Sequence, residues 1–173
     1  MADTPDGIVL ERHRDLAGRY SVWWRRVLLA VVGLFLIAAL VDVFGQRPHG
    51  SRVATPAATL SVYAPTAIRG GLLWEARFHI TAHQDIEEAT LVLDSGWAEG
   101  LQINTIEPSP VGEASRDGKL AFDLGHIAAG HSFVLYMEFQ TNATNVGRRT
   151  ANVRLDDGER ELMTVHRTIT IFP

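Results

Sequence analysis

Residues 72–81 read LLWEARFHIT, and this stretch decides the fold. Its apolar positions recur two residues apart, at Leu72, Trp74, Ala76, Phe78 and Ile80. Four of the five positions that alternate with them are polar, and the fifth is Leu73. Alternation with a period of two predicts a β-strand that has one face in a core and one in solvent.

The same pattern recurs downstream, where residues 133–139 read FVLYMEF. Weaker strand patterns cover residues 59–64, 89–93, 101–106, 120–124, 150–155 and, after the hairpin turn Asp156-Asp157-Gly158, 161–172. In the last of these, Arg167 shares a face with Ile169 and Ile171, so we expect a β-bulge near His166.

Seven or eight short strands between residues 59 and 173 predict a mainly β protein, an Ig-like antiparallel β-sandwich. No long helical pattern interrupts them, which disfavours a parallel α/β fold. We expect the core to contain the large apolar side chains Trp74, Phe78, Phe122, Phe133, Leu135 and Phe139.

A second decisive stretch lies upstream, where residues 27–45 read VLLAVVGLFLIAALVDVFG with Asp42 as the one charge. A hydrocarbon core of about 30 Å needs about 20 apolar residues in a helix. The stretch therefore predicts one transmembrane helix. Trp23, Trp24, Arg25 and Arg26 come directly before it and form the aromatic and basic membrane anchor typical of an interface.

The distribution of arginine predicts the orientation of this helix. Five arginines precede it, whereas the corresponding window after it holds Arg47 and Arg52. The positive-inside rule then puts the N-terminus in the cytoplasm and the C-terminal domain outside the cell membrane. A cleaved secretory signal is the alternative, with a site near Val43-Phe44-Gly45, but 26 residues before the apolar run are long for a signal.

These features divide the chain into four parts. Residues 1–26 form a cytoplasmic segment, either a short helix on the inner leaflet or a frayed tail. Residues 27–45 form the transmembrane helix, and residues 46–58 form a polar linker containing Pro and Gly. Residues 59–173 form the extracytoplasmic sandwich.

Composition excludes several functions. The net charge of −4 argues against nucleic-acid binding, which needs clustered positive charge. The absence of Cys excludes a disulfide framework, a thiolate zinc site and a Cys nucleophile. No Gly-x-Ser-x-Gly motif or phosphate-binding glycine loop occurs, so we expect no enzyme and no cofactor. The carboxylate pairs Glu87-Glu88 and Asp156-Asp157 lie beside predicted turns, where we expect them to be solvated.

Two pairs of residues are candidate sites. His126 and His131 flank a short loop and are the weak candidates for a metal site, although zinc needs a third ligand. Arg148 and Arg149 form a small basic spot beside a turn, which is either an interaction site or a solvated edge. Trp97 is the third candidate, either as an exposed contact residue or as a cap on the sandwich.

The segment 124–130, Leu-Gly-His-Ile-Ala-Ala-Gly, followed by the strand at 133–139, resembles a pattern of bacterial exported Ig-like domains of the CARDB (cell-adhesion-related) type. In that pattern a strand ends in Leu-Gly, a short apolar loop ends in Gly, and a long strand follows. The resemblance covers most of residues 59–173. It implies a binding, spacing or assembly domain and carries no catalytic residues.

Together these observations predict a single-pass, membrane-anchored, non-catalytic binding or accessory subunit. Its expected partners are the lipid bilayer and another integral membrane protein or envelope component. The alternative is an envelope factor that handles copper or zinc, or assembles a redox complex, through His126 and His131.

Overall fold

The computed structural model describes residues 19–41 and 46–173, and the chain divides into two units, Met1–Phe44 and Gly45–Pro173. In the first unit the described element is helix α2 (Arg19–Leu40). It already includes the residues upstream of Val27, where the transmembrane helix was predicted to start, because nothing between Ser21 and Arg26 breaks a helix. The predicted end of the transmembrane helix at Gly45, and residues 1–18 of the predicted cytoplasmic segment, lie outside the described residues.

The second unit contains thirteen strand segments and one 3-10 helix within residues 46–173. These are β1 (Pro48–Ala54), β2 (Ala58–Pro65), β3 (Ala67–Arg69), β4 (Leu73–Ala82), β5 (Ile86–Leu93), η1 (Ser95–Trp97), β6 (Leu101–Glu107), β7 (Gly112–Arg116), β8 (Lys119–Ile127), β9 (Ser132–Thr141), β10 (Gly147–Thr150), β11 (Val153–Asp157), β12 (Arg160–Val165) and β13 (Thr168–Phe172). The predicted seven or eight strands are too few. The missed segments β1, β3, β7 and β10 each lie at the edge of a sheet and have no clear apolar alternation.

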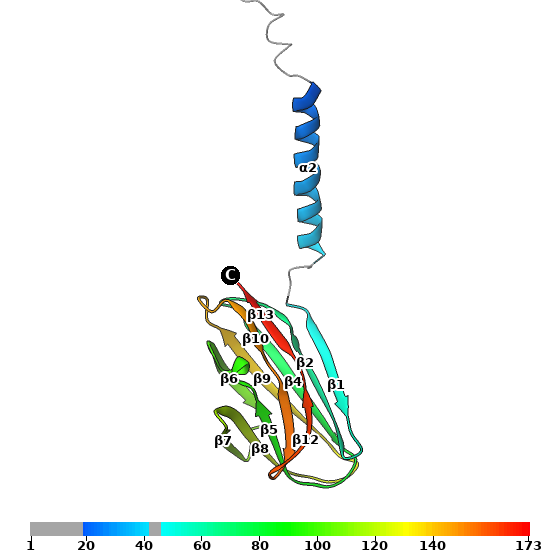
Figure 1. Ribbon diagram of the computed structural model, residues 1–173, viewed down its shortest axis with the longest axis vertical. Helices are drawn as coiled ribbons and strands as arrows, with labels where there is room; N and C mark the ends of the chain where they lie inside the picture. The colour runs from blue at the N-terminus through cyan, green and yellow to red at the C-terminus, as the bar shows by residue number, and fades with distance from the viewer. Residues whose placement is uncertain (1–18, 42–45) are drawn as a thin grey trace, which may run out of the picture. The chain divides into compact units, whose positions relative to one another are not determined.

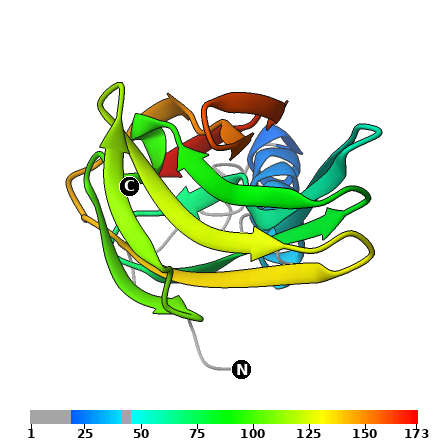
Figure 2. The same ribbon diagram turned by 90° about the horizontal axis from the view of Figure 1, so that it is seen from below.

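The strands form three sheets, drawn in Figures 1 and 2. We name the sheet with the order β1-β2-β4-β9-β6 the front sheet and the sheet with the order β12-β11-β5-β8-β7 the back sheet; in Figure 1 the back sheet is nearer the viewer. A small sheet, β10-β13-β3, contains the one parallel pair that the described strands form, between β13 and β3. Two antiparallel five-stranded sheets around one apolar core confirm the predicted mainly β, Ig-like sandwich.

The centre of the front sheet is the pairing of the two strands with the strongest alternation, β4 and β9. Trp74 lies opposite Phe139, and Phe78 lies opposite Leu135. All four side chains are buried, whereas Glu75 and Arg77 between them on β4 are exposed. The alternation at residues 72–81 therefore marks inner and outer faces as predicted, although Leu72 precedes the strand and is exposed.

The predicted core is confirmed except at one residue. Five of the six predicted side chains are buried: Trp74, Phe78, Phe122, Leu135 and Phe139. Phe133 is partly buried against the core because it lies near the start of β9, at the end of the sheet. Burial of each such side chain stabilises the fold by about 1.5–3 kcal/mol.

The predicted linker at residues 46–58 is wrong for most of its length. Residues 48–54 form β1, which pairs antiparallel with β2 from Pro48 opposite Pro65 to Ala54 opposite Thr59. The sequence PHGSRVA lacks the alternation of a strand because β1 is an edge strand with a neighbour on one side only. Pro48 occupies its first position, where proline is tolerated. The sandwich therefore begins at Pro48 and not at Thr59.

The predicted single strand at residues 161–172 is also divided. The chain leaves the back sheet at Val165 and enters the small sheet at Thr168. Arg167 lies at this crossing, and the backbone there pairs with the chain at residues 151–152: Arg167 N donates to Asn152 Oδ1 at 3.1 Å, and Ala151 N donates to Arg167 O at 2.9 Å. A change of sheet replaces the expected bulge near His166.

Candidate interaction surface

Three side chains form a row across the outer face of the front sheet. Tyr63 on β2 lies opposite Arg77 on β4, which lies opposite Tyr136 on β9. The guanidinium carbon of Arg77 is 5.9 Å from the ring centroid of Tyr63 and 4.9 Å from that of Tyr136. Both distances allow a cation–π interaction. We call these three residues the Tyr–Arg–Tyr row.

The Tyr–Arg–Tyr row is exposed although it is held in place. Tyr63 is 46% exposed and Tyr136 is 39% exposed. Side chains already fixed by their neighbours lose little conformational entropy on binding. Tyr and Arg are also enriched among the residues that contribute most to binding interfaces. This row is therefore the best candidate for contact with another molecule on the sandwich.

Carboxylates lie beside the row on the same face. Glu75 Oε1 is 3.6 Å from Arg77 Nη2, and both side chains are about half exposed, so this ion pair contributes little. Glu75 also lies directly opposite Glu138 on β9. Like charges opposite each other across two strands are destabilising. The face next to the row is therefore acidic and rich in hydrogen-bond acceptors.

An open pocket of about 400 Å³ lies at the end of this face, lined by Gly100, Leu101, Gln102, Gln140, Thr141, Asn142 and Ala143. Gln140 on β9 lies opposite Gln102 on β6, and both are exposed. Within the described part of the chain, neither glutamine side chain has a hydrogen-bond partner. The Thr141 hydroxyl is already engaged, since it accepts from Trp74 Nε1 at 3.0 Å. The side-chain amides of Gln102 and Gln140 are therefore available to a ligand in this pocket.

Trp97 is not an exposed contact residue, which corrects that prediction and confirms the cap. The 3-10 helix η1 turns Trp97 inward until it is 0% exposed. Its ring centroid lies 5.8 Å from that of Trp74 and 5.3 Å from that of Phe78. Its Nε1 donates to Ala151 O at 3.0 Å. The backbone of η1 packs directly against the backbone at Thr150. This close approach requires glycine at position 96, because a Cβ there would collide with the carbonyl of Thr150.

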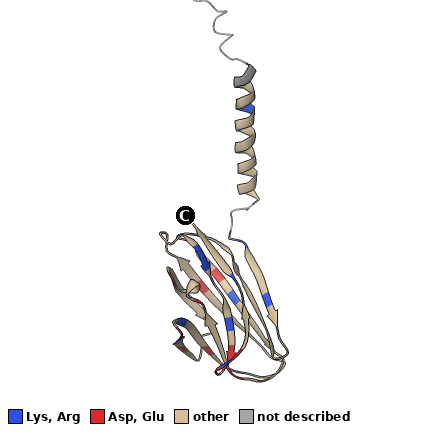
Figure 3. Cartoon of the chain, viewed as in Figure 1, with Lys and Arg blue, Asp and Glu red and all other residues tan. Residues whose placement is uncertain are grey.

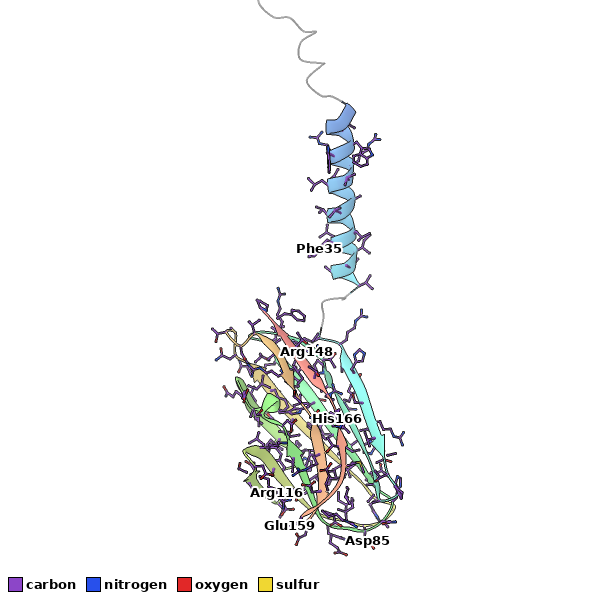
Figure 4. The ribbon with its side chains drawn as sticks, viewed as in Figure 1. Phe35, Asp85, Arg116, Arg148, Glu159 and His166 are labelled. Atoms are coloured by element: carbon purple, nitrogen blue, oxygen red, sulfur yellow. The ribbon has the colours of Figure 1, made fainter. Side chains whose placement is uncertain are left out.

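The two arginines of the predicted basic spot lie on β10 and differ in their contacts. Arg148 is exposed and lies at the opposite end of the domain from Asp85 and Glu159 (Figure 4). Arg149 is partly buried and donates to Glu99 O and Asn145 Oδ1. Arg149 therefore fastens the loop before β10 to the segment after η1. The role of Arg148 in binding stays a prediction.

The two predicted metal ligands are exposed and lie at opposite ends of their loop. His126 is near the end of β8, and His131 Nδ1 lies 3.3 Å from Ala129 O. Among the described residues, no group of three or more His, Asp or Glu side chains could hold a metal ion. The structure therefore brings no third ligand to this pair.

The carboxylate pair at the β11–β12 hairpin is not uniformly solvated, which corrects the prediction for Asp156. Asp156 is buried, and its Oδ1 lies 3.0 Å from Arg154 Nε. Its Oδ2 lies 3.5 Å from Arg116 Nη1, which also donates to Gly158 O at 2.7 Å. These contacts tie the end of β7 to the β11–β12 hairpin, so they are explained by the fold.

A second buried charge, Arg167, has no carboxylate partner among the described residues. Its Nη1 donates to His49 O, Ser51 Oγ and Val62 O at 2.9, 2.9 and 3.0 Å. Its Nη2 donates to Ala64 O at 2.6 Å. Burial lowers the pKa of this guanidinium below its ordinary value. Arg167 therefore fastens the crossing between β12 and β13 to both β1 and β2.

The predicted membrane anchor lies on α2 itself. The Trp23 and Trp24 rings meet edge to face with centroids 5.6 Å apart, and Arg25 and Arg26 are exposed. Figure 3 shows the basic positions near the described start of the helix, and residues 27–40 carry no charge. The stretch Val22–Leu40 is long and apolar enough to cross a membrane, and none of it is buried.

Comparison with known proteins assigns no family to this chain. No family model and no curated protein matches the chain. Among solved structures, a CARDB domain from Pyrococcus furiosus, solved with di-metal ions, is 14% identical, with a TM-score of 0.39 over 69% of this chain and 97% of that one. A cohesin module of a Clostridium perfringens family 33 glycoside hydrolase is 15% identical, with a TM-score of 0.41 over 71% and 98%.

The C-terminal domain of wzt is 12% identical, with a TM-score of 0.40 over 76% of this chain and 86% of that one. The expected CARDB-type resemblance therefore has a counterpart among the structural neighbours. Identities and TM-scores this low carry neither a family nor a function to this chain.

The Tyr–Arg–Tyr row was not predicted from the sequence. Its members lie on the polar positions of alternating strands, where a Tyr or Arg is unremarkable. The signal was partly present, because Arg77 and Tyr136 fall on the outward positions of the two best-predicted strands. Their meeting depends on strand order and register, which the pattern of a single strand does not contain.

Proposed function

We propose that this chain is a single-pass membrane protein whose N-terminal segment lies in the cytoplasm and whose Ig-like sandwich lies outside. The sandwich acts as a non-catalytic binding or accessory subunit. Its partner is another integral membrane protein or a component of the cell envelope.

One observation carries this proposal: an apolar helix with no buried surface joins a sandwich that has a complete core of its own. Leu34, Phe35 and Leu36 are more than 60% exposed, as are several neighbours along α2. All residues of the buried core lie between Ala58 and Ile171. A contiguous apolar surface of this size is unfavourable in water, at about 25 cal/mol per Å². A bilayer removes that cost.

The direction of insertion is supported by the positive-inside rule, since five arginines precede residue 27. The binding role is supported by the exposed Tyr–Arg–Tyr row, which offers a fixed contact surface. The expectation of a partner in or near the same membrane is supported by the short distance along the chain between Leu40 and Pro48. Eight residues reach at most about 28 Å.

Membrane extraction and co-purification test this function. We expect the full chain to remain in the membrane pellet after an alkaline carbonate wash, because the 19-residue, mostly apolar span Val22–Leu40 holds it there. Cross-linking followed by purification in mild detergent should recover the same membrane or envelope protein repeatedly. A matched variant, Tyr63→Ala with Arg77→Ala, should still pellet but recover less of that partner.

Release of the chain by carbonate would contradict the anchor. Repeated recovery of the chain alone, from membranes that retain it, would contradict the accessory role and leave the anchor standing.

A further inference from the structure

We propose that the outer face of the front sheet, from Tyr136 to the pocket at Gln140, binds a neutral, hydroxyl-rich oligosaccharide. This inference names a ligand for the proposed binding role, and it rests on the proposed location of the sandwich outside the membrane. All residues that form the face belong to the sandwich.

The side chains along this strip have a regular order. On β9, Tyr136, Glu138 and Gln140 point to the outer face at two-residue intervals, so they span about 13 Å. On β4, Arg77 and Glu75 lie opposite the first two. The strip therefore has an aromatic ring at one end, carboxylates in the middle and amides at the other end. The 400 Å³ pocket lies at the amide end.

These groups suit hydroxyls better than other ligand groups. A hydroxyl both donates and accepts, so it can donate to Glu75 or Glu138 and also accept from a glutamine amide. Gln102 and Gln140 each offer an amide nitrogen and an amide oxygen without a protein partner among the described residues. The exposed ring of Tyr136 offers a flat apolar surface to the C–H face of a sugar ring. The pocket is open, so it leaves room for a ligand that lies across the surface of the sheet.

The charge of the strip opposes acidic ligands. Three carboxylates, Glu75, Glu107 and Glu138, lie on or beside it, so a phosphate or an acidic polymer would be repelled. A lysine side chain would be attracted by these carboxylates, but its ammonium only donates and so leaves the amide nitrogens of Gln102 and Gln140 without an acceptor. A hydroxyl both donates and accepts, so it can use the carboxylates and the amide nitrogens together.

The test is a titration of the full, isotope-labelled chain in a detergent without a sugar headgroup. The probes are neutral hexasaccharides of glucose, mannose and N-acetylglucosamine, with hexagalacturonate and hexalysine as charged comparisons. We expect at least one neutral hexasaccharide to bind with a Kd of about 1 mM or tighter. The side-chain amide signals of Gln102 and Gln140 should shift, while that of Gln84 in the β4–β5 turn should not.

Matched variants locate the site. Gln140→Ala and Tyr136→Ala should each weaken binding by about tenfold or more, since each removes a contact group without touching the core. Gln84→Ala and Phe172→Ala, an exposed amide and an exposed aromatic elsewhere on the domain, should leave the affinity unchanged.

Failure of every neutral hexasaccharide to shift these signals up to about 10 mM would overturn the proposal. So would binding that survives both site variants, or tighter binding of hexalysine or hexagalacturonate. The carbonate wash distinguishes failure of this proposal from failure of the membrane role. A chain that stays in the pellet but binds no sugar contradicts only the proposed oligosaccharide ligand. A chain that washes off but binds sugar contradicts only the proposed membrane location.

Discussion

Arg167→Met should lower the stability of the sandwich by about 3 kcal/mol, which corresponds to a fall in Tm of about 10 °C for a domain of this size. The substitution preserves much of the side-chain length and removes the charge. It leaves the hydroxyl of Ser51 and three backbone carbonyls, those of His49, Val62 and Ala64, without their guanidinium donor. A side-chain substitution cannot remove these backbone carbonyls, so they would stay buried without a hydrogen-bond donor.

The guanidinium has a cost of its own, because its burial is unfavourable and its Nε has no hydrogen-bond partner. Hydrogen bonds from a charged donor contribute about 1.5–3 kcal/mol each, and those from Nη1 and Nη2 together outweigh that cost. Arg167→Lys keeps the charge but loses the planar fork that reaches β1 and β2 together, so it should recover less than half of the lost stability.

Thermal unfolding of the full chain in detergent, followed by circular dichroism of the β-sheet signal, measures both variants. Arg148→Met is the matched control, because Arg148 is exposed on β10 and its replacement should change stability by less than about 0.5 kcal/mol. An Arg167→Met variant as stable as the parent would show that the bonds from Arg167 to β1 and β2 contribute nothing net.

Trp97→Ala should destabilise the sandwich by about 3–5 kcal/mol, the range for deleting a large buried aromatic side chain. Trp97 is fully buried and lies against three other aromatic rings, those of Trp74, Phe78 and Phe139. Alanine would leave a cavity at the centre of this cluster. Trp97→Phe should cost less, about 2 kcal/mol, because it fills part of the space but leaves Ala151 O without the indole donor.

Urea unfolding of the two variants checks this order, with Trp24→Ala as the control. Trp24 is 64% exposed on α2, so its removal should leave the unfolding of the sandwich unchanged. Equal effects at residues 24 and 97, or no effect at residue 97, would contradict the burial of Trp97.

The parts of the fold that follow from local pattern were predictable from the sequence. The alternation in β4 and β9 survives in the structure because each strand has one buried and one exposed face. The DDG turn between β11 and β12 was predictable from its own sequence, since Gly158 supplies the positive φ of 59° that the hairpin requires.

The parts that depend on tertiary contact were not predictable. β1 has one neighbour and carries Pro48 and Gly50, so its sequence reads as a linker. Trp97 lies among turn residues, and only the position of η1 over the core decides that its ring points inward. Arg167 falls on the inward face as the pattern indicated, but its carbonyl partners come from β1 and β2, more than 100 positions earlier in the chain.

The same reasoning applies to the candidate surface. Each residue of the Tyr–Arg–Tyr row is an ordinary outward residue of its own strand, and β2, β4 and β9 become neighbours only in the assembled front sheet. The pocket at Gln102 and Gln140 likewise needs the pairing of β6 with β9. An interaction surface on a sheet is a property of strand order, which short-range patterns leave open.

The central claim is that α2 crosses a membrane with the sandwich outside, and residue-specific labelling tests it most directly. The chain contains no Cys, so one introduced thiol reports one position. On intact cells, a membrane-impermeant maleimide should label Ser109→Cys, in the exposed segment after β6, on a full-length chain. It should label Ala2→Cys only after the cells are permeabilised. Labelling of Ala2→Cys with protection of Ser109→Cys, or protection of both, would contradict the account.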